Sequence, residues 1–197
     1  MPFVAPADIM PLVQTLSFFY PQSEKVVAYL QQHASHLRCK RGTLLLRAGM
    51  VCEHIYFIRK GTVRGFIIDG GKDITSWITA DGEMVTSISG LDMQTPAVEN
   101  IETLEDCELL VLTTHAVNDL YQLHPEFNIT ARKLLQQYYR DAEKRAYLSR
   151  LSSAEQKYLY FVQHYPHLSN RVPLKYIASF LGITIETLSR VRKKLAS

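Results

Sequence analysis

One stretch near the end of the chain carries side chains whose types and spacing could read a nucleic acid. On a helical wheel at about 100° per residue, the polar face of residues 184–195 holds Glu186, Ser189, Arg190 and Lys193. The opposite face holds Leu188, Val191 and Leu195. An arginine can donate two hydrogen bonds to guanine O6 and N7, and a carboxylate can accept one from cytosine N4. The stretch therefore predicts a helix that reads base edges in a major groove.

Two short helices joined by a tight turn are expected to position this face. Pro173 suits a first helical position, where its missing N–H costs nothing. An apolar stripe at helical spacing follows, formed by Leu174, Ile177, Ala178 and Leu181. Gly182 interrupts the pattern, and Thr184 can cap the second helix with its hydroxyl. Residues 172–197 thus predict a helix-turn-helix.

Three other interpretations of this stretch remain open. Glu186 and Arg190 could form an ordinary surface ion pair, worth about 0.3–0.5 kcal/mol at this spacing; such a pair is compatible with DNA binding, because it can exist in the free protein. The basic C-terminus could be a solvated tail, or the helix could lie on a membrane. The membrane interpretation is weakened because the apolar side is narrow and lacks Trp and Phe.

Composition limits the class of protein. The chain has 197 residues, 47% hydrophobic and 21% charged, as in a globular protein with a proper core. Its formal net charge is +3, yet residues 151–197 hold seven Lys and Arg against two Glu, so the basic charge lies with the predicted helix-turn-helix.

Apolar runs are shorter than a membrane helix needs, and the N-terminus lacks a signal-peptide pattern. The scattered Cys39, Cys52 and Cys107 argue against a disulfide framework. We expect no membrane association and a reducing, cytoplasmic location.

Upstream of this stretch the hydrophobic pattern changes twice. Residues 6–34 have helical spacing, and residues 37–112 contain short runs rich in β-branched and aromatic residues between glycine turns. These runs span 44–49, 54–61, 62–71, 73–82 and 107–113. They predict an antiparallel jelly-roll-like β-barrel. Helical patterns then return over about 114–123, from Pro125 to about Ser149, and over 154–164.

The fold class is therefore α+β, with three expected units. They are residues 1–123 (N-terminal helices and the barrel), 124–150 (a long connecting helix) and 151–197 (the helix-turn-helix). The long helix carries a seam at spacings of three and four, formed by Phe127, Ala131, Leu134, Tyr138 and Ala142. Such a seam could be intramolecular core or a dimer interface. We favour a dimer, because the barrel is too short to cover the whole helix.

With this combination of parts, the chain resembles the Crp/Fnr family of bacterial transcription regulators over nearly its whole length. The most specific pieces are LLLRAGMVCEHIYFIRKGTVR (44–64), DGE (81–83), ETLEDCELLVL (102–112) and LGITIETLSRVRKKL (181–195). The subgroup it resembles most has a short C-terminal domain. The resemblance implies a cytoplasmic bacterial homodimer that binds double-stranded DNA, with RNA polymerase as a further partner.

The resemblance also implies roles for residues of the second helix. Base contacts are expected from Thr184, Ile185, Glu186, Ser189 and Arg190. Phosphate contacts are expected from Lys175, Thr187, Arg192, Lys193 and Lys194. Glu186 falls on the family's cytosine-reading glutamate and Arg190 on its guanine-reading arginine. These positions imply TGA-like half-sites in a near-palindrome, roughly 34 Å apart.

The family's barrel often binds cyclic AMP, and the matching positions here are only partly suitable. Gly82 and Glu83 match the pair that meets the ribose, whereas Ala97 and Val98 stand where the phosphate is held. Tyr138 stands on the long helix where small hydroxyl side chains meet the base. Because these positions offer no cationic group to hold the phosphate, we do not expect cyclic AMP to bind. We expect no cofactor, and the sequence does not identify another effector. Glu83 could equally be a turn carboxylate without a ligand.

Two other functional classes are an enzyme and a regulatory module that does not read DNA. A cupin-like enzyme would need a His-x-His pair with a following Glu, but His54 stands alone, and the sequence has no nucleophile elbow, phosphate loop or metal-binding helix motif. We therefore expect neither an enzyme nor a metal site. The alternative function is a ligand- or partner-binding regulatory module without DNA reading.

Overall fold

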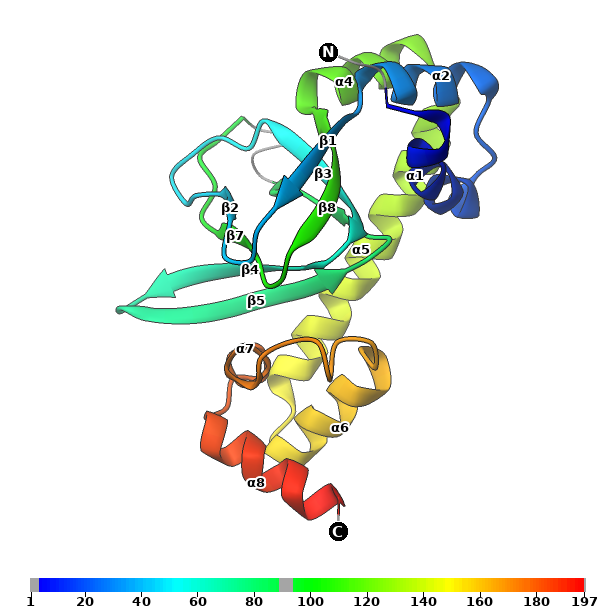
Figure 1. The fold of residues 1–197 in the computed structure, drawn as a ribbon. Helices are drawn as coiled ribbons and strands as arrows, with labels where there is room; N and C mark the ends of the chain where they lie inside the picture. Colours follow the sequence, from blue (N-terminus) through cyan, green and yellow to red (C-terminus); the bar gives the residue numbers. More distant parts are fainter. Residues whose placement is uncertain (1–3, 89–93, 197) are drawn as a thin grey trace.

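The computed structural model describes residues 4–88 and 94–196. Figure 1 shows a β-structure beside the upper half of one long helix, with short helices gathered at each end of that helix. The long helix is α5 (Phe127–Arg150), which begins two residues after the expected start at Pro125. The arrangement is α+β, as the hydrophobic pattern predicts.

Helices from both sides of the barrel sequence form a common N-terminal layer. They are α1 (Pro6–Phe19), α2 (Glu24–His33) and α4 (Thr114–Leu123). Ser23 caps α2 by accepting from the Val26 N–H at 3.3 Å, and Thr113 caps α4 in the same way. Their apolar faces pack together with Phe127 at the start of α5 and with Phe57 of the barrel.

The barrel is built from two antiparallel four-stranded sheets. One has the order β1-β8-β3-β6 and the other β2-β7-β4-β5. The strands are β1 (Ser35–Cys39), β2 (Leu44–Leu46), β3 (His54–Lys60), β4 (Thr62–Asp69), β5 (Lys72–Ala80), β6 (Met84–Val85), β7 (Asn100–Thr103) and β8 (Cys107–Thr113). A core that includes Ile58, Val63, Ile101 and Leu109 lies between the sheets. The five predicted runs correspond to β2, β3, β4, β5 and β8, whereas β1, β6 and β7 were not assigned from the sequence.

The β4–β5 hairpin is the longest pair of strands and faces the C-terminal helices (Figure 1). Its turn places Gly70 and Gly71 at φ of 54° and 76°, as a type I′ turn requires. Gly65 has a different reason to be glycine, because a Cβ there would lie 2.1 Å from the Trp77 ring. β5 ends the order of its sheet, so one side of this strand is open to another element.

The C-terminal unit consists of three short helices around the lower end of α5. They are α6 (Ala154–His164), α7 (Leu174–Leu181) and α8 (Ile185–Ala196). Pro173 precedes α7 as its N-cap, one position earlier than expected. Leu188 of α8 is fully buried, but Leu195 is exposed, so the buried side of α8 is shorter than predicted.

One apolar cluster joins this unit to the barrel. It contains Phe161, Ile177 and Leu188 from the helices, and also Ile78 of β5 and Leu104 of the turn after β7. The expected boundary at residue 150 therefore separates segments of the chain, but it does not separate two independent cores.

Candidate nucleic-acid interface and effector cleft

The turn between α7 and α8 has the geometry expected of a helix-turn-helix. Gly182 ends α7 in the left-handed conformation, with φ 63° and ψ 38°, which glycine adopts without steric cost. The Ile183 N–H donates to the Ala178 carbonyl at 3.0 Å. Thr184 then accepts from the Thr187 N–H at 3.2 Å. Lys157 of α6 donates to the Leu181 carbonyl at 3.0 Å and so holds the end of α7.

The predicted base-reading face of α8 is exposed. Glu186, Ser189, Arg190 and Lys193 all lie on the surface, while Leu188 anchors the opposite side. The pKa of Glu186 is held below its ordinary value by hydrogen bonds from the Glu186 backbone N–H and from the Thr184 hydroxyl. This side chain is therefore an acceptor at neutral pH. Within the residues that the structure describes, Glu186 and Arg190 do not form the ion pair considered above. Ile185 is also exposed.

The residues expected to contact phosphate have different surroundings. Lys175 is exposed at the start of α7, with its ammonium 4.5 Å from the Tyr176 ring centroid. Lys194 pairs with Glu155 of α6 at 2.6 Å, so a phosphate would have to replace that carboxylate. The Thr187 hydroxyl lies 3.1 Å from that of Thr184 and belongs to the cap. Arg192 is half-buried and Lys193 is exposed.

A second candidate site is a cleft of about 1340 Å³ between the barrel and α5. Glu83 and Tyr138 meet in it, as the resemblance implies. The Tyr138 hydroxyl accepts from the Met84 N–H at 2.8 Å and donates to the Glu83 carboxylate at 3.2 Å. Gly82 forms the turn before Glu83, where its N–H donates to the Ile58 carbonyl at 2.8 Å. Glu83, the acceptor that the resemblance places against a ribose, is thus hydrogen-bonded to α5 of the same chain.

The other two residues expected in the effector pocket are not part of the cleft. Ala97 is buried, and its N–H donates to the Met50 carbonyl at 2.9 Å. Val98 is exposed to solvent. The expectation that these two residues line the pocket is therefore wrong, because their segment is paired with residues 49–51 on another side of the barrel.

Basic side chains line the cleft from the helical side, which sequence reasoning missed. They are Arg132, Arg140, Lys144 and Arg145 of α5 with the imidazoles of His164 and His167 in the C-terminal unit. Glu99 faces them from the barrel and accepts from the Trp77 indole N–H at 2.8 Å. The spacing of these charges on α5 is that of ordinary surface residues, so the sequence held no signal for their convergence.

Burial gives Glu83 a pH-dependent effect on stability. Burial, with a contribution from Asp141, raises the pKa of Glu83 above its ordinary value, although the Tyr138 hydroxyl opposes the shift. The folded state therefore binds a proton at the Glu83 carboxyl more tightly than the unfolded state does. The stabilising contribution of Glu83 is lost as pH rises through its pKa in the folded state.

Glu83→Gln is accordingly expected to raise the melting temperature more at about pH 8 than at about pH 4.5. The amide oxygen can still accept from Tyr138, so the hydrogen bond is retained. Thermal unfolding followed at both pH values measures the effect, and Glu53→Gln, at an exposed position, controls for the loss of one carboxylate. A Glu83→Gln increment that is equal at both pH values would contradict this account.

The face of α5 expected to join two copies needs correction. Phe127 is buried in the chain's own N-terminal core, and Leu134 packs against that core. Tyr138 is bonded to Glu83 and Met84. Ala131 is half-buried, and Ala142 alone of the predicted seam is exposed. The N-terminal helices cover the first turns of α5, which the length of the barrel sequence did not predict.

A neighbouring face of α5 is apolar and exposed. Leu135 is 53% exposed and Tyr139 is 68% exposed, and they are followed at spacings of three and four by the exposed Ala142 and Ala146. This spacing is typical of a helix that packs along a partner helix. We call these four residues the α5 stripe.

Other kinds of site find less support in the described residues. Residues 4–88 and 94–196 contain no group of three or more His, Cys, Asp or Glu side chains that could hold a metal ion. Cys39, Cys52 and Cys107 are buried free thiols. Within the same ranges, every helix is too short or too polar to cross a membrane.

Comparisons with known proteins agree with the architecture. Residues 36–124 match the model of the cyclic nucleotide-binding domain. The transcriptional activator protein FnrA of Stutzerimonas stutzeri is 24% identical over 166 residues, which cover 77% of this chain and 66% of that protein, slightly under two thirds of its length.

Two solved structures show the same fold over most of the chain. FixK2 of Bradyrhizobium japonicum has a TM-score of 0.70 and 16% identity, covering 83% of this chain and 84% of its own. The c-di-GMP responsive global regulator CLP of Xanthomonas campestris has a TM-score of 0.69 and 19% identity, covering 88% of this chain and 92% of its own. The chain thus contains a cyclic nucleotide-binding domain, and its barrel, connecting helix and C-terminal helix-turn-helix together have the fold of these solved structures.

Proposed function

We propose that this protein is a dimeric regulator that reads a near-palindromic duplex with TGA-like half-sites. The observation that carries the proposal is the exposed α8 face, in which an ionised Glu186 stands one helical turn before Arg190. Thr184, Ile185 and Ser189 complete the proposed base contacts. Lys175, Thr187, Arg192, Lys193 and Lys194 supply the proposed phosphate contacts. The proposed partners are double-stranded DNA, a second copy of the chain and RNA polymerase.

The test is selection of bound duplexes from a random pool by the purified protein. A two-fold symmetric consensus with TGA-like half-sites supports the proposal, and log affinity should fall linearly with log salt. The alternative, a regulatory module without DNA reading, predicts that no duplex is enriched even at low salt. A consensus without symmetry would contradict the dimeric part of the proposal.

We place the dimer contact on the α5 stripe. Leu135, Tyr139 and Ala142 also line the cleft, so a second copy packed along α5 would close the open side of the cleft. A dimer would in this way give the cleft a third wall. The proposed effector is a small molecule other than cyclic AMP, because Glu83 is already bonded to Tyr138 and the described barrel residues that line the cleft include no Lys or Arg to hold a phosphate.

Leu135→Lys is expected to raise the dimer dissociation constant by about two orders of magnitude or more, because the interface would bury an unpaired ammonium. Sedimentation velocity over a concentration series measures this. Leu123→Lys on α4 is the matched control, since Leu123 is 64% exposed and lies outside the α5 stripe. An unchanged dimer in Leu135→Lys would remove the α5 stripe from the interface.

A further inference from the structure

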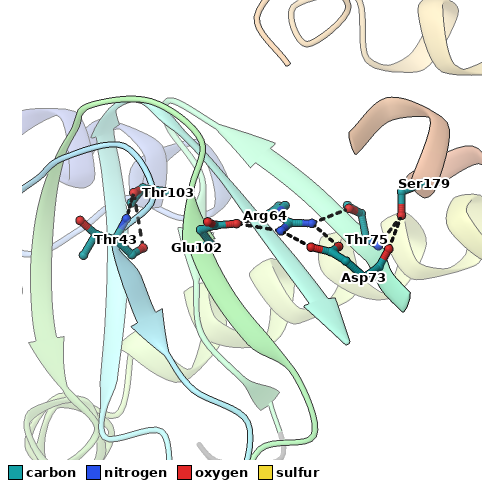
Figure 2. Close-up of polar contacts among 7 residues, drawn as sticks. All are labelled: Thr43, Arg64, Asp73, Thr75, Glu102, Thr103 and Ser179. Carbon is teal, nitrogen blue, oxygen red and sulfur yellow. Dashed lines mark hydrogen bonds and ion pairs between the residues drawn. The ribbon is translucent and has the colours of Figure 1, made fainter. Parts of the chain in front are cut away.

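A buried arginine lies where the barrel meets the helix-turn-helix. Arg64 of β4 is only 2% exposed. Figure 2 shows its guanidinium between two carboxylates: it donates to Asp73 at 2.5 and 2.6 Å and to Glu102 at 2.9 Å. A fourth bond reaches the Thr75 hydroxyl at 3.0 Å. A buried charge needs such complete pairing, so the side chain is held in one orientation.

The helix-turn-helix contributes an aromatic cover to this arginine. The guanidinium carbon lies 3.9 Å from the centroid of the Tyr176 ring on α7 and 4.0 Å from that of Phe66 on β4. A guanidinium over an aromatic face is attracted by the electron density of the ring. Tyr176 therefore ties α7 to a group that the barrel has already fixed.

Ser179, on the same side of α7, bonds the open edge of β5. Its hydroxyl accepts from the Thr75 N–H at 2.9 Å and donates to the Asp73 carbonyl at 3.1 Å (Figure 2). An edge strand leaves backbone groups without a neighbouring strand, and here a serine of α7 satisfies two of them. We call the set Arg64, Asp73, Thr75, Tyr176 and Ser179 the hairpin–α7 contact.

Two further interactions stabilise the same junction. Arg171, in the segment before α7, pairs with Asp81 and, at 2.6 Å, with Glu105, both of which belong to turns of the barrel. Beneath these polar groups, Ile78 of β5 packs in one cluster with Ile177 of α7. The junction is therefore apolar inside and ionic at its rim, as stable interfaces are.

The hairpin–α7 contact leaves the DNA-reading face open. In Figure 1, α7 lies between β5 and α8, so α8 is on the side of the unit that faces away from the barrel. Glu186 and Arg190 stay exposed in this position. The contact thus orients α8 relative to the barrel and α5 without covering it. A contact of this kind can position α8 for binding but does not block its DNA-reading face.

We propose that Tyr176 and Ser179 are positioning residues that determine the half-site spacing of the duplex this protein reads. The inference rests on the proposed function. In a dimer joined along α5, the distance between the two α8 helices is set by how each helix-turn-helix is held to its own barrel. A dimer with both units held firmly accepts one spacing between half-sites, and a dimer with loosened units accepts several at a higher entropic cost.

The experiment compares the wild type with the double variant Tyr176→Leu/Ser179→Ala. Both residues lie outside the buried positions of α7, which are Ile177, Ala178 and Leu181. The probes are duplexes with the selected half-sites at the selected spacing, at spacings one and two base pairs longer or shorter, and with a single half-site. The double variant should lose about tenfold affinity at the selected spacing, keep its single half-site affinity, and show a flatter profile across spacings. Tyr176→Phe, which keeps the aromatic cover, should retain the wild-type profile.

Hydrogen exchange measures the hairpin–α7 contact without DNA. The Thr75 amide donates to Ser179, so it should exchange faster in the double variant than in the wild type or in Tyr176→Phe. An unchanged spacing profile despite faster Thr75 exchange would overturn this proposal and leave the proposed function intact. Tighter binding of the double variant at every spacing would also overturn it, since the contact would then be inhibitory. A wild type that binds no duplex would overturn both proposals.

Discussion

Arg190→Ala is expected to weaken binding to the selected duplex by about 1–3 kcal/mol and to relax the preference at one base pair of each half-site. A guanidinium that donates to guanine O6 and N7 discriminates against the other bases at that position, because they lack the paired acceptors. Titration of the variant with duplexes substituted at each half-site position measures both effects. The loss should be largest for the guanine-containing site and small for sites already substituted there.

Lys193→Ala is the matched comparison, because it lies three residues further along α8 and is proposed to contact phosphate. A phosphate contact carries little sequence information, so this variant should weaken all duplexes alike and reduce the salt slope by about one. If Arg190→Ala behaved like Lys193→Ala, the base-reading role of Arg190 would be wrong. If Arg190→Ala changed neither affinity nor preference, the arginine would lie outside the interface.

Arg64→Met is expected to have the largest effect on stability, about 3 kcal/mol of the free energy of unfolding. The substitution leaves Asp73 and Glu102 facing a space that a cation filled, and removes the group that Tyr176 covers. The Asp73 side chain is 41% exposed and can be hydrated, which places the loss at the lower end of the range for broken buried pairs. For a chain of this size, that corresponds to a fall in melting temperature of about 6–12 °C.

The triple variant Arg64→Met/Asp73→Asn/Glu102→Gln separates lost pairing from lost packing. It removes both uncompensated carboxylates, and replacing an entire buried ionic group by neutral side chains is often close to neutral. Thermal unfolding should therefore recover most of the loss in the triple variant. If Arg64→Met alone unfolded at the wild-type temperature, the guanidinium would not be needed to hold the two carboxylates. If the triple variant recovered nothing, packing would dominate.

Local patterns were enough to predict most helices and the turn of the helix-turn-helix. The left-handed Gly182 and the Thr184 cap depend on the residues themselves and their immediate neighbours, so they can be recognised without knowing the rest of the fold. The exposure of Glu186 and Arg190 follows from the helical period once Leu188 is buried.

The strands were predicted unevenly for the same reason. Long runs with alternating or apolar patterns, such as β4 and β5, carry a signal within the strand. β6 has two residues and β7 has four, so their assignment depends on the strands that they pair with. Pairing partners distant in the chain, such as β1 and β8, cannot be inferred from composition.

The long helix shows where periodicity stops being informative. Its pattern predicts an apolar face but not the element that covers that face. Phe127 and Leu134 turned out to pack against the N-terminal helices, and Leu135 and Tyr139 are the exposed residues. A shift of one residue along the helix turns the face by about 100°, and only the positions of α1, α2 and α4 decide between the two faces.

The sequence by itself determined the helical segments, the glycine turns and the outward chemistry of α8, because these depend on interactions within a few residues. Only the tertiary structure decided that Tyr138 bonds Glu83, that Ala97 and Val98 lie outside the cleft, and that Tyr176 covers Arg64. These contacts join residues that are far apart in the chain, and they depend on how whole elements dock. Docking is set by the summed packing of many side chains, for which a local pattern carries no signal.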